Sequence, residues 1–243
     1  MNWRAECAVI VPCLNEGAAI GGLIQSIREG LPAVFVIDDA SSDDTADNAA
    51  RAGAEVLRQA TNQGKGAALQ AGWKWAADAG FKWVLTMDGD GQHLPADIPG
   101  FLDCAERTDS DLVVGNRMQN PAGMPWLRRK VNRWMSDRLS AIAQTPLPDS
   151  QCGFRLIRLE ALAGLTVNAA HFEIESEVLL AFARANRRIA FVPIQVIYKS
   201  ERSKIHPLRD TLRWLKWMRS VTAERGNQRI QVRSAKANQS TSL

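Results

Sequence analysis

The sequence predicts an α/β protein with a mostly parallel sheet flanked by helices, and two observations carry this prediction. Apolar runs of four or five residues alternate with stretches of helical periodicity through residues 8–116, which is typical of buried strands joined by helices. The chain has 243 residues, of which 46% are hydrophobic and 23% charged, so it can bury a sizeable core. These numbers exclude a disordered chain, a collagen-like fibre and a disulfide scaffold.

The first half of the chain supplies most of this sheet. We expect strands over residues 8–12, 33–37, 54–57, 83–87 and 111–114. Helices are expected between them, over residues 18–28, from a cap at Ser42 or Asp43 to Arg51, over 64–78, and from Pro95 to about Arg107. Ligands of such sheets bind outside the carboxyl ends of the strands, so the residues that follow each strand are the candidates for function.

The second half has a different pattern. We expect a basic helix over residues 126–142, an antiparallel strand over 153–158, a helix over 173–185, and one or two strands within 189–198. Residues 1–205 are predicted to form one domain with halves 1–116 and 117–205, followed by a cationic amphipathic helix within 206–221 and a mobile tail over 222–243.

Charge is distributed unevenly between the two halves. Residues 1–116 contain 8 Lys and Arg against 17 Asp and Glu, a net charge of −9. Residues 117–243 contain 22 against 9, a net charge of +13, and the two halves together give +4. An acidic half suits a bound cation and a basic half suits phosphates.

The cysteines and the start of the chain bear on the cellular compartment of the protein. Cys7, Cys13, Cys104 and Cys152 lie far apart and form no C-x-x-C pair, which favours a reducing environment over a zinc site or a disulfide framework. The sequence shows no signal peptide and no run of about 18 apolar residues. We therefore expect a cytoplasmic protein, with a peripheral position at the inner face of the plasma membrane left open.

The segment Asp88-Gly89-Asp90-Gly91-Gln92-His93 is the sharpest feature of the sequence. Two carboxylates at positions i and i+2 would face opposite sides of a strand, but the two glycines allow the chain to turn there. Asp88 and Asp90, with the amide oxygen of Gln92, are then suited to Mg²⁺ or Mn²⁺, with substrate phosphates as further ligands. The alternative is a turn in which the aspartates only shape the backbone.

Three further groups are candidates for ligand binding. Asp38 and Asp39 end a strand and exceed what a helix cap needs, so Asp39 is a candidate ligand of a ribose or base. Lys65 opens a helix next to two glycines, where it could hold an anion or be an exposed loop lysine; the segment matches neither a P-loop nor a dinucleotide fingerprint. Basic residues in the second half suit phosphates, namely Arg117, Arg128 to Arg133, Arg155, Arg202 and Lys204, although a solvated helix face is favoured for Arg128 to Arg133.

Together these residues resemble the family 2 glycosyltransferases of GT-A fold, and within them the dolichol- or polyprenol-phosphate mannose synthases. The resemblance covers about residues 8–205. Six ordered motifs carry it, namely Val11-Pro12-x-x-Asn15-Glu16, Asp38-Asp39-x-Ser41-x-Asp43-x-Thr45, Asn62-x-Gly64-Lys65-Gly66, Asp88-x-Asp90-x-Gln92-His93, Gly115-x-Arg117 and Gly153-Phe154-Arg155.

The resemblance implies transfer of a sugar from a GDP- or UDP-sugar, with inversion at the anomeric carbon. It implies a nucleotide- and metal-binding half over residues 1–116 and an acceptor half over 117–205. The implied roles are nucleotide-sugar binding by Pro12, Asn15, Glu16, Asp39, Lys65 and Asp88, metal binding by Asp88, Asp90 and Gln92, catalysis by Asp90 and Arg117, and contacts to donor or acceptor phosphates by Arg117, Arg155, Arg202 and Lys204.

The acceptor decides whether a general base is needed. A lipid phosphate is already anionic near neutral pH, whereas a sugar or lipid hydroxyl must lose a proton to a carboxylate. Glu173 or Glu175 is the candidate base, and the alternative is that both residues only favour the start of their helix. We expect a polyprenyl phosphate acceptor and keep the glycan or lipid hydroxyl as the alternative.

Other classes of protein explain less of the sequence. A sugar-1-phosphate nucleotidyltransferase needs a glycine-rich loop directly after the first strand, and Pro12-Cys13-Leu14-Asn15 does not supply one. A non-enzymatic basic module for membranes leaves the clustered acids unexplained, and nucleic acid is not expected because those acids would repel its phosphates. The helix near residues 208–221, with Trp and basic residues, is open to two interpretations, contact with an anionic membrane surface or packing on the domain.

Overall fold

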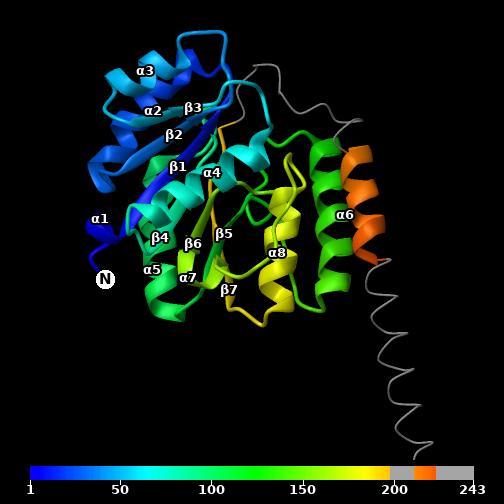
Figure 1. Cartoon of the computed structure of the whole chain (residues 1–243). Coiled ribbons are helices and arrows are strands. Elements are labelled where there is room, and N and C mark those ends of the chain that lie inside the picture. Colours follow the sequence, from blue (N-terminus) through cyan, green and yellow to red (C-terminus); the bar gives the residue numbers. More distant parts are fainter. Residues whose placement is uncertain (198–210, 223–243) are drawn as a thin grey trace, which may run out of the picture. The chain divides into compact units, whose positions relative to one another are not determined.

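The computed structural model describes residues 1–197 and 211–222, and the chain divides into two units, Met1–Ser200 and Glu201–Leu243. In the first unit, seven strands form one sheet in the order β3-β2-β1-β4-β6-β5-β7 (Figure 1). The strands are β1 (Cys7–Cys13), β2 (Val34–Asp38), β3 (Glu55–Arg58), β4 (Trp83–Thr86), β5 (Leu112–Asn116), β6 (Arg155–Arg158) and β7 (Ile189–Pro193). Strand β6 runs antiparallel to both neighbours and all other pairs are parallel, which confirms the predicted α/β class.

Helices flank the sheet, as Figure 1 shows. They are α1 (Trp3–Glu6), α2 (Gly17–Gly30), α3 (Thr45–Arg51), α4 (Lys65–Asp78), α5 (Ile98–Thr108), preceded by the 3₁₀ turn η1 (Pro95–Asp97), α6 (Trp126–Ala143), α7 (Leu159–Leu162) and α8 (Ile174–Arg184). The predicted elements within residues 1–197 are all present with shifted ends. Helices α1 and α7 were not predicted, because four residues are too few to show helical periodicity.

The second unit contains a helix over residues 211–222. It overlaps the helix predicted near 208–221, whose first residues lie outside the described part of the chain. The predicted divisions at 205 and 221 and the mobile tail stay predictions.

Close packing of helix α4 on the sheet fixes the position of its first residue. A Cβ atom at Gly72 would lie 2.4 Å from the Ile10 side chain of β1, so only glycine lets the helix approach this closely. Strands β1 and β2 are buried almost throughout, as expected for parallel strands covered on both faces. Lys65, at the start of α4, is thereby held beside the carboxyl ends of the central strands.

Two further observations concern the environment of the chain. All four cysteines are buried and none forms a disulfide. Among residues 1–197 and 211–222, no helix combines the length and the apolar character needed to cross a membrane.

Candidate active site

Five strands bring polar residues to one edge of the sheet. Strands β1, β2, β4 and β5 end at this edge, and antiparallel β6 begins there, with Arg155 opposite Thr86 of β4 and Val114 of β5. The Thr86 hydroxyl donates a hydrogen bond of 2.7 Å to the carbonyl of Gly153, which ties the entry of β6 to the end of β4. The sequence motifs that lie far apart in the chain therefore meet at this edge, as predicted from the parallel sheet.

Asp88 and Asp90 lie in a tight turn after β4. Gly91 has φ +65°, a left-handed conformation that suits glycine, and the backbone N–H of Gln92 donates to the Asp90 carboxylate at 2.9 Å. A Cβ at Gly89 would lie 2.6 Å from the Cys13 sulfur of β1, so the turn packs directly on the neighbouring strand end. The two glycines are thus required by the geometry, as the sequence indicated.

Lys65 connects this turn to helix α8. Its ammonium lies 2.6 Å from an oxygen of Asp88 and 2.7 Å from Oε1 of Glu175, and 5.6 Å from the ring centre of Phe172. Burial lowers the pKa of Lys65, but the two carboxylates raise it by more, so the side chain stays charged. We call Lys65, Asp88 and Glu175 the lysine bridge.

Gly153 forms the floor of the lysine bridge. A Cβ at this position would lie 2.8 Å from the Lys65 ammonium and 2.9 Å from an Asp88 oxygen. Any larger residue would push the lysine and the aspartate away from each other. The glycine of the Gly153-Phe154-Arg155 motif is therefore explained by this close approach.

The two aspartates of the turn have opposite pKa shifts. Burial by itself raises the pKa of Asp88, but the neighbouring positive charges, that of Lys65 first, together outweigh burial and the pKa falls to about 2. The pKa of Asp90 is raised, because the side chain is desolvated and lies close to the negative charge of Asp88. The turn thus holds negative charge that Lys65 neutralises only in part, an environment that a divalent cation would stabilise.

The donor atoms at the turn fit a hard cation. Asp88 and Asp90 offer carboxylate oxygens and Gln92 an amide oxygen, all of which are partly accessible. Within the described residues no three His, Cys, Asp or Glu side chains gather as a complete metal site. Mg²⁺ is commonly held by one or two carboxylates, with water and substrate phosphates as its other ligands, and this turn matches that pattern.

His93 closes the turn on its buried side. Burial lowers the pKa of His93 to about 4, so the imidazole is neutral near pH 7. Its ring stacks on Phe154 with centroids 5.2 Å apart, and its Nδ1 has no hydrogen-bond partner among the described residues. The histidine therefore packs the turn against Phe154, the residue that precedes β6.

The aspartates at the end of β2 hold loops together. The two oxygens of Asp39 accept hydrogen bonds from the backbone N–H groups of Gln63 at 2.6 Å and Gly64 at 2.8 Å. Asp38 accepts from the N–H of Ser41 at 3.0 Å and lies 3.3 Å from Nε of Arg58. Sequence reasoning assigned Asp39 to the nucleotide; the structure shows that it also shapes the loop that leads to Lys65.

The other residues predicted for the nucleotide lie at the end of β1. Asn15 has φ +54°, and its side-chain oxygen accepts from the N–H of Ser42 at 2.8 Å. The N–H of Glu16 donates to the Thr45 hydroxyl, also at 2.8 Å. Pro12 is half-buried within β1. The strand ends of β1 and β2 are therefore cross-linked, which places Pro12, Asn15 and Glu16 on the same edge as the turn.

The start of helix α4 is covered by the segment before α8. The N–H groups of Gly66 and Ala67 donate to the carbonyl of Ala170, at 2.8 and 3.2 Å. A Cβ at Gly66 would lie 2.1 Å from the carbonyl oxygen of Ala169. The Ala170 carbonyl thus already accepts from these two N–H groups, and the binding of an anion by Lys65 stays a prediction.

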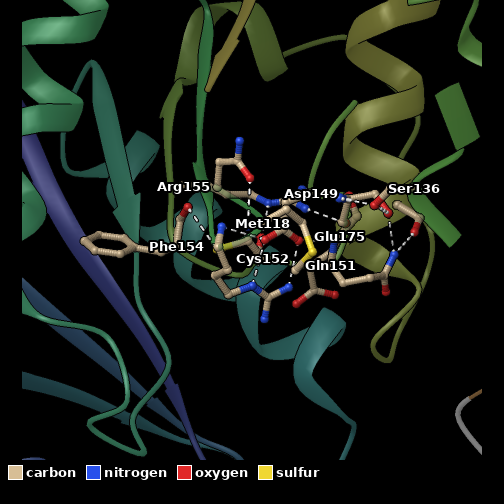
Figure 2. A network of polar contacts seen from close by, with 12 residues as sticks. Met118, Ser136, Asp149, Gln151, Cys152, Phe154, Arg155 and Glu175 are labelled. Atoms are coloured by element: carbon tan, nitrogen blue, oxygen red, sulfur yellow. Dashed lines mark hydrogen bonds and ion pairs between the residues drawn. The ribbon is translucent and has the colours of Figure 1, made fainter. Parts of the chain in front are cut away.

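Two predicted phosphate ligands are engaged inside the protein. Arg117 forms a two-bonded ion pair with buried Asp149, at 2.8 and 2.7 Å, and its N–H donates to the same carboxylate. The Arg155 guanidinium donates to the carbonyls of Cys152, Ser150 and Glu175 (Figure 2). Both arginines therefore position the segment 149–155 and helix α8, and their predicted contacts to phosphates stay predictions.

The structure separates the two candidate bases. Glu173 is the residue before the first turn of α8 and is half-buried, whereas Glu175 is 5% exposed and takes part in the lysine bridge. The Oε2 atom of Glu175 is buried without a hydrogen-bond partner among the described residues. Glu177 holds the preceding loop through the N–H groups of Asn168 and Ala169. Of the three acids, Glu175 is the one in contact with the motif residues.

Sequence reasoning missed Asp149, and the structure does not describe two residues that the sequence predicted. Asp149 lies four residues before the motif that begins at Gly153 but belongs to no motif itself, and its pairing with Arg117 across 32 residues is a tertiary contact that only the fold reveals. Arg202 and Lys204, predicted to contact phosphates, lie outside the described residues.

Comparisons with known proteins give the family. The chain matches the model described as glycosyl transferase family 2 over residues 8–166. It is 32% identical over 202 residues to the undecaprenyl-phosphate mannosyltransferase of Micrococcus luteus, which covers 77% of this chain and 82% of that protein. It is 29% identical over 173 residues to the polyprenol monophosphomannose synthase of Mycolicibacterium smegmatis, covering 66% of this chain and 64% of that protein.

A solved structure agrees with the fold. The glucosyl-3-phosphoglycerate synthase of Mycobacterium tuberculosis, in complex with Mn²⁺, uridine diphosphate and phosphoglyceric acid, superposes with a TM-score of 0.67 at 22% identity, over 90% of this chain and 78% of that one. With the family match spanning the sheet and the strand ends described above, the chain belongs to glycosyl transferase family 2, has the GT-A fold and is a glycosyltransferase of the polyprenol-phosphate mannose synthase type.

Proposed function

We propose that this protein transfers a sugar from a nucleoside-diphosphate sugar to a polyprenyl phosphate, with inversion at the anomeric carbon and with a divalent metal. The observation that carries the proposal is the turn at Asp88 and Asp90 beside the lysine bridge. Two carboxylates and one ammonium at the carboxyl edge of the sheet suit a metal–diphosphate group. The named functions of the relatives in Micrococcus luteus and Mycolicibacterium smegmatis support a lipid phosphate as acceptor.

The donor would lie across the ends of β1, β2 and β4. Asp88, Asp90 and Gln92 would hold Mg²⁺ or Mn²⁺, which when bound stabilises the negative charge on the leaving diphosphate. Pro12, Asn15 and Glu16 would contact the nucleotide. Asp39 would serve the same site by shaping the loop before Lys65, and it keeps lone pairs for a ribose hydroxyl.

Lys65 and Glu175 would act as a pair on the donor side. The ammonium holds Asp88 in place at 2.6 Å and offsets part of the charge of the turn. Glu175 in turn holds Lys65 at 2.7 Å, so its carboxylate fixes where the positive charge sits. This ordered positive charge, beside carboxylates for the metal, is suited to a diphosphate whose charge grows as the sugar departs.

Arg117 and Arg155 would position the acceptor half rather than grip a free phosphate. Their guanidinium groups already bind Asp149 and three backbone carbonyls. Arg202 and Lys204 keep the proposed role of acceptor-phosphate contacts. A cytoplasmic, membrane-peripheral location would follow from a lipid acceptor.

The test is a transfer assay with a panel of GDP- and UDP-sugars. Labelled sugar should move into an organic-soluble product only with polyprenyl phosphate, one donor class and Mg²⁺ or Mn²⁺ present. The matched variant Glu106→Gln, exposed and remote in α5, should behave as the unchanged protein, whereas Asp88→Asn should lose the reaction. Equal transfer without any polyprenyl phosphate would contradict the proposed acceptor.

A hydroxyl acceptor is the second candidate, and Glu175 is the observation that favours it. Glu175 is buried beside the motif residues and its Oε2 has no hydrogen-bond partner within residues 1–197 and 211–222, which suits a proton acceptor better than half-buried Glu173. Glu175→Gln separates the two candidates. With a lipid phosphate the variant should keep measurable transfer, whereas a hydroxyl acceptor would lose it almost completely.

A further inference from the structure

We propose that Lys65 controls how the turn at Asp88 and Asp90 fills with its ligands. Its ammonium weakens the binding of a free divalent ion and strengthens the binding of a nucleoside diphosphate once the ion is present. The turn would then take up metal and diphosphate together rather than metal alone. This inference rests on the metal–diphosphate site of the proposed function, and it gives Lys65 a role beyond contact with the donor.

The position of the ammonium makes it a competitor of a metal ion. Nζ of Lys65 lies 2.6 Å from Oδ1 of Asp88, one of the two carboxylates that we expect to bind the metal. Asp88 would have to share its carboxylate between this ammonium and the ion, or give up the ammonium. Either costs free energy, because like charges a few ångströms apart repel strongly where water is scarce. Lys65 therefore opposes the binding of the ion by itself.

The lysine is confined beside Asp88 by its other neighbours. Its side chain is 16% exposed, and Oε1 of Glu175 holds the ammonium at 2.7 Å. The backbone of Glu175 is itself fixed, since Nη1 of Arg155 donates to its carbonyl at 2.7 Å (Figure 2). The ammonium also packs on Gly153, where an added Cβ would lie 2.8 Å from it. A shift of the positive charge away from Asp88 would disturb these contacts.

Helix α4 does not need this cation at its start. Lys65 is the first residue of the helix, where a positive charge is unfavourable because the free N–H groups already carry partial positive charge. The carbonyl of Ala170 accepts from the N–H groups of Gly66 and Ala67 at the same end. A largely buried lysine kept there, against the helix dipole and between two carboxylates, is typical of a functional charge.

The balance of charges explains both parts of the effect. Three carboxylates and one ammonium meet at this place, namely those of Asp88, Asp90, Glu175 and Lys65. They leave two negative charges, which one divalent ion neutralises. Without the ammonium three would remain, so the ion alone would bind more tightly, but the loaded turn would keep a negative charge that repels a diphosphate. Arg117 does not change this balance because Asp149 pairs with it, and the charge of Arg128 near Asp90 is the same with and without Lys65.

The experiment measures binding rather than transfer. Chelator-treated full chain is titrated with Mn²⁺, and electron paramagnetic resonance reports the free ion. Calorimetry then follows GDP and UDP with Mn²⁺ in excess. Lys65→Met should bind Mn²⁺ alone about tenfold more tightly than the unchanged protein does. With Mn²⁺ in excess, it should bind the preferred nucleotide about tenfold more weakly.

The variant Glu175→Gln shifts the charge balance the other way. The amide keeps the size of the side chain and can still accept a hydrogen bond from Lys65, but one negative charge is lost. Mn²⁺ alone should therefore bind about tenfold more weakly, and the nucleotide should bind the loaded protein at least as tightly as before. This variant decides the question alone if Lys65→Met, which leaves Glu175 buried without its cation, does not fold.

The matched control is Lys74→Met on the same helix. The Lys74 side chain is 76% exposed and pairs with Asp78, so the same substitution there should leave both affinities unchanged. Thermal unfolding verifies that each variant is folded.

The signs of the changes decide the inference. Tighter Mn²⁺ and weaker nucleotide in Lys65→Met support it, as does weaker Mn²⁺ in Glu175→Gln. Weaker binding of both ligands in Lys65→Met overturns it, because a lysine that only keeps the turn in shape would give that result. Weaker nucleotide with unchanged Mn²⁺ overturns it as well and leaves Lys65 as a phosphate contact. Unchanged or tighter Mn²⁺ in Glu175→Gln also contradicts it.

The unchanged protein separates this inference from the proposed function. If it binds nucleotide only with Mn²⁺ and the variants show the wrong signs, the inference fails and the proposed function stands. If it binds no Mn²⁺ with or without nucleotide, the inference fails together with the metal of the proposed function. The transfer assay then still tests the sugar donor and the lipid acceptor.

Discussion

Two strands of the sheet end in paired aspartates, and the structure uses the two pairs in different ways. Asp38 and Asp39 after β2 accept hydrogen bonds from backbone N–H groups of the protein itself. Asp88 after β4 pairs with Lys65, and Asp90 accepts from the N–H of Gln92 and lies close enough to Asp88 to feel its negative charge. Both oxygens of Asp39 are hydrogen-bonded within the fold, whereas Asp88 and Asp90 together keep a negative charge that a ligand can neutralise. Acids at strand ends thus differ by what their oxygens already bind.

The largest expected effect concerns Asp149, another carboxylate whose oxygens are hydrogen-bonded within the protein. Asp149 is buried and bound twice by the Arg117 guanidinium, so Asp149→Ala removes the carboxylate that offsets this buried charge. The free energy of unfolding should fall by about 3–5 kcal/mol. Urea unfolding measures this loss, and the exposed Asp103→Ala on α5 should change stability by less than about 0.5 kcal/mol. If the two variants lower the free energy of unfolding equally, the ion pair of Asp149 contributes no more to stability than an exposed aspartate does.

The same ion pair predicts a pH dependence. Burial raises the pKa of Asp149, but the Arg117 charge and its hydrogen bonds outweigh burial, so the pKa in the folded protein lies below its usual value. The stabilisation is therefore complete above the unfolded pKa of about 3.9 and is lost as the pH falls through the lower folded pKa. Asp149→Asn should flatten the fall in stability below about pH 4, which thermal unfolding across that range can check.

The next effect concerns Asp88 and Asp90, the aspartates that we expect to bind the metal. Asp90→Asn should lower the transfer rate roughly 100-fold or more, because one of the two carboxylates that complete the metal site is lost. Stability should stay the same or rise, since the charge of Asp90 is held close to that of Asp88. Initial rates together with melting temperatures test both statements. If Asp90→Asn lowers the melting temperature but keeps the transfer rate, Asp90 stabilises the fold and does not hold a metal.

A smaller effect is expected for the first pair. Asp39→Ala removes the acceptor of the Gln63 and Gly64 N–H groups, and each hydrogen bond to a charged group stabilises by about 1.5–3 kcal/mol, part of which water in the vacated space replaces. We expect the free energy of unfolding, measured with urea, to fall by about 2 kcal/mol. Donor binding should also weaken, because the loop before Lys65 shifts. Weak donor binding without any loss of stability would show that Asp39 contacts the nucleotide directly.

The smallest effect concerns the floor of the lysine bridge. The added methyl of Gly153→Ala would meet the Lys65 ammonium and Asp88 at less than 3.0 Å. The lysine must shift, so transfer should fall about tenfold while the rest of the sheet is untouched. Gly100→Ala, where nothing lies within 4 Å of the added Cβ, is the matched control and should keep full activity.

The sequence predicts the fold well because the strands are apolar runs and the helices are periodic. The ranges for β1, β2 and β4 were close, and the antiparallel β6 was expected. The placement of Asn15, Asp39 and Asp88 on one edge follows from parallel topology alone. The sequence could not show what each acid binds, since Asp39, Asp88 and Asp90 look equivalent in a string of residues.

The remaining features depend on tertiary contacts. Arg117 and Arg155 have the composition of phosphate ligands, yet Asp149 and backbone carbonyls occupy them. The contact of Ala170 with the start of α4 joins segments about 100 residues apart, so no local pattern announces it. The link from Lys65 to Glu175 was missed for the same reason, although both residues were candidates.

The central claim is that the turn at Asp88 and Asp90 binds a nucleoside diphosphate through a divalent ion. Calorimetry with chelator-treated protein measures this directly, by titrating GDP and UDP with and without Mn²⁺. We predict strong binding of one nucleotide only when Mn²⁺ is present, and no gain from Mn²⁺ in Asp90→Asn. Full affinity in the absence of metal, unchanged by Asp90→Asn, would contradict the account.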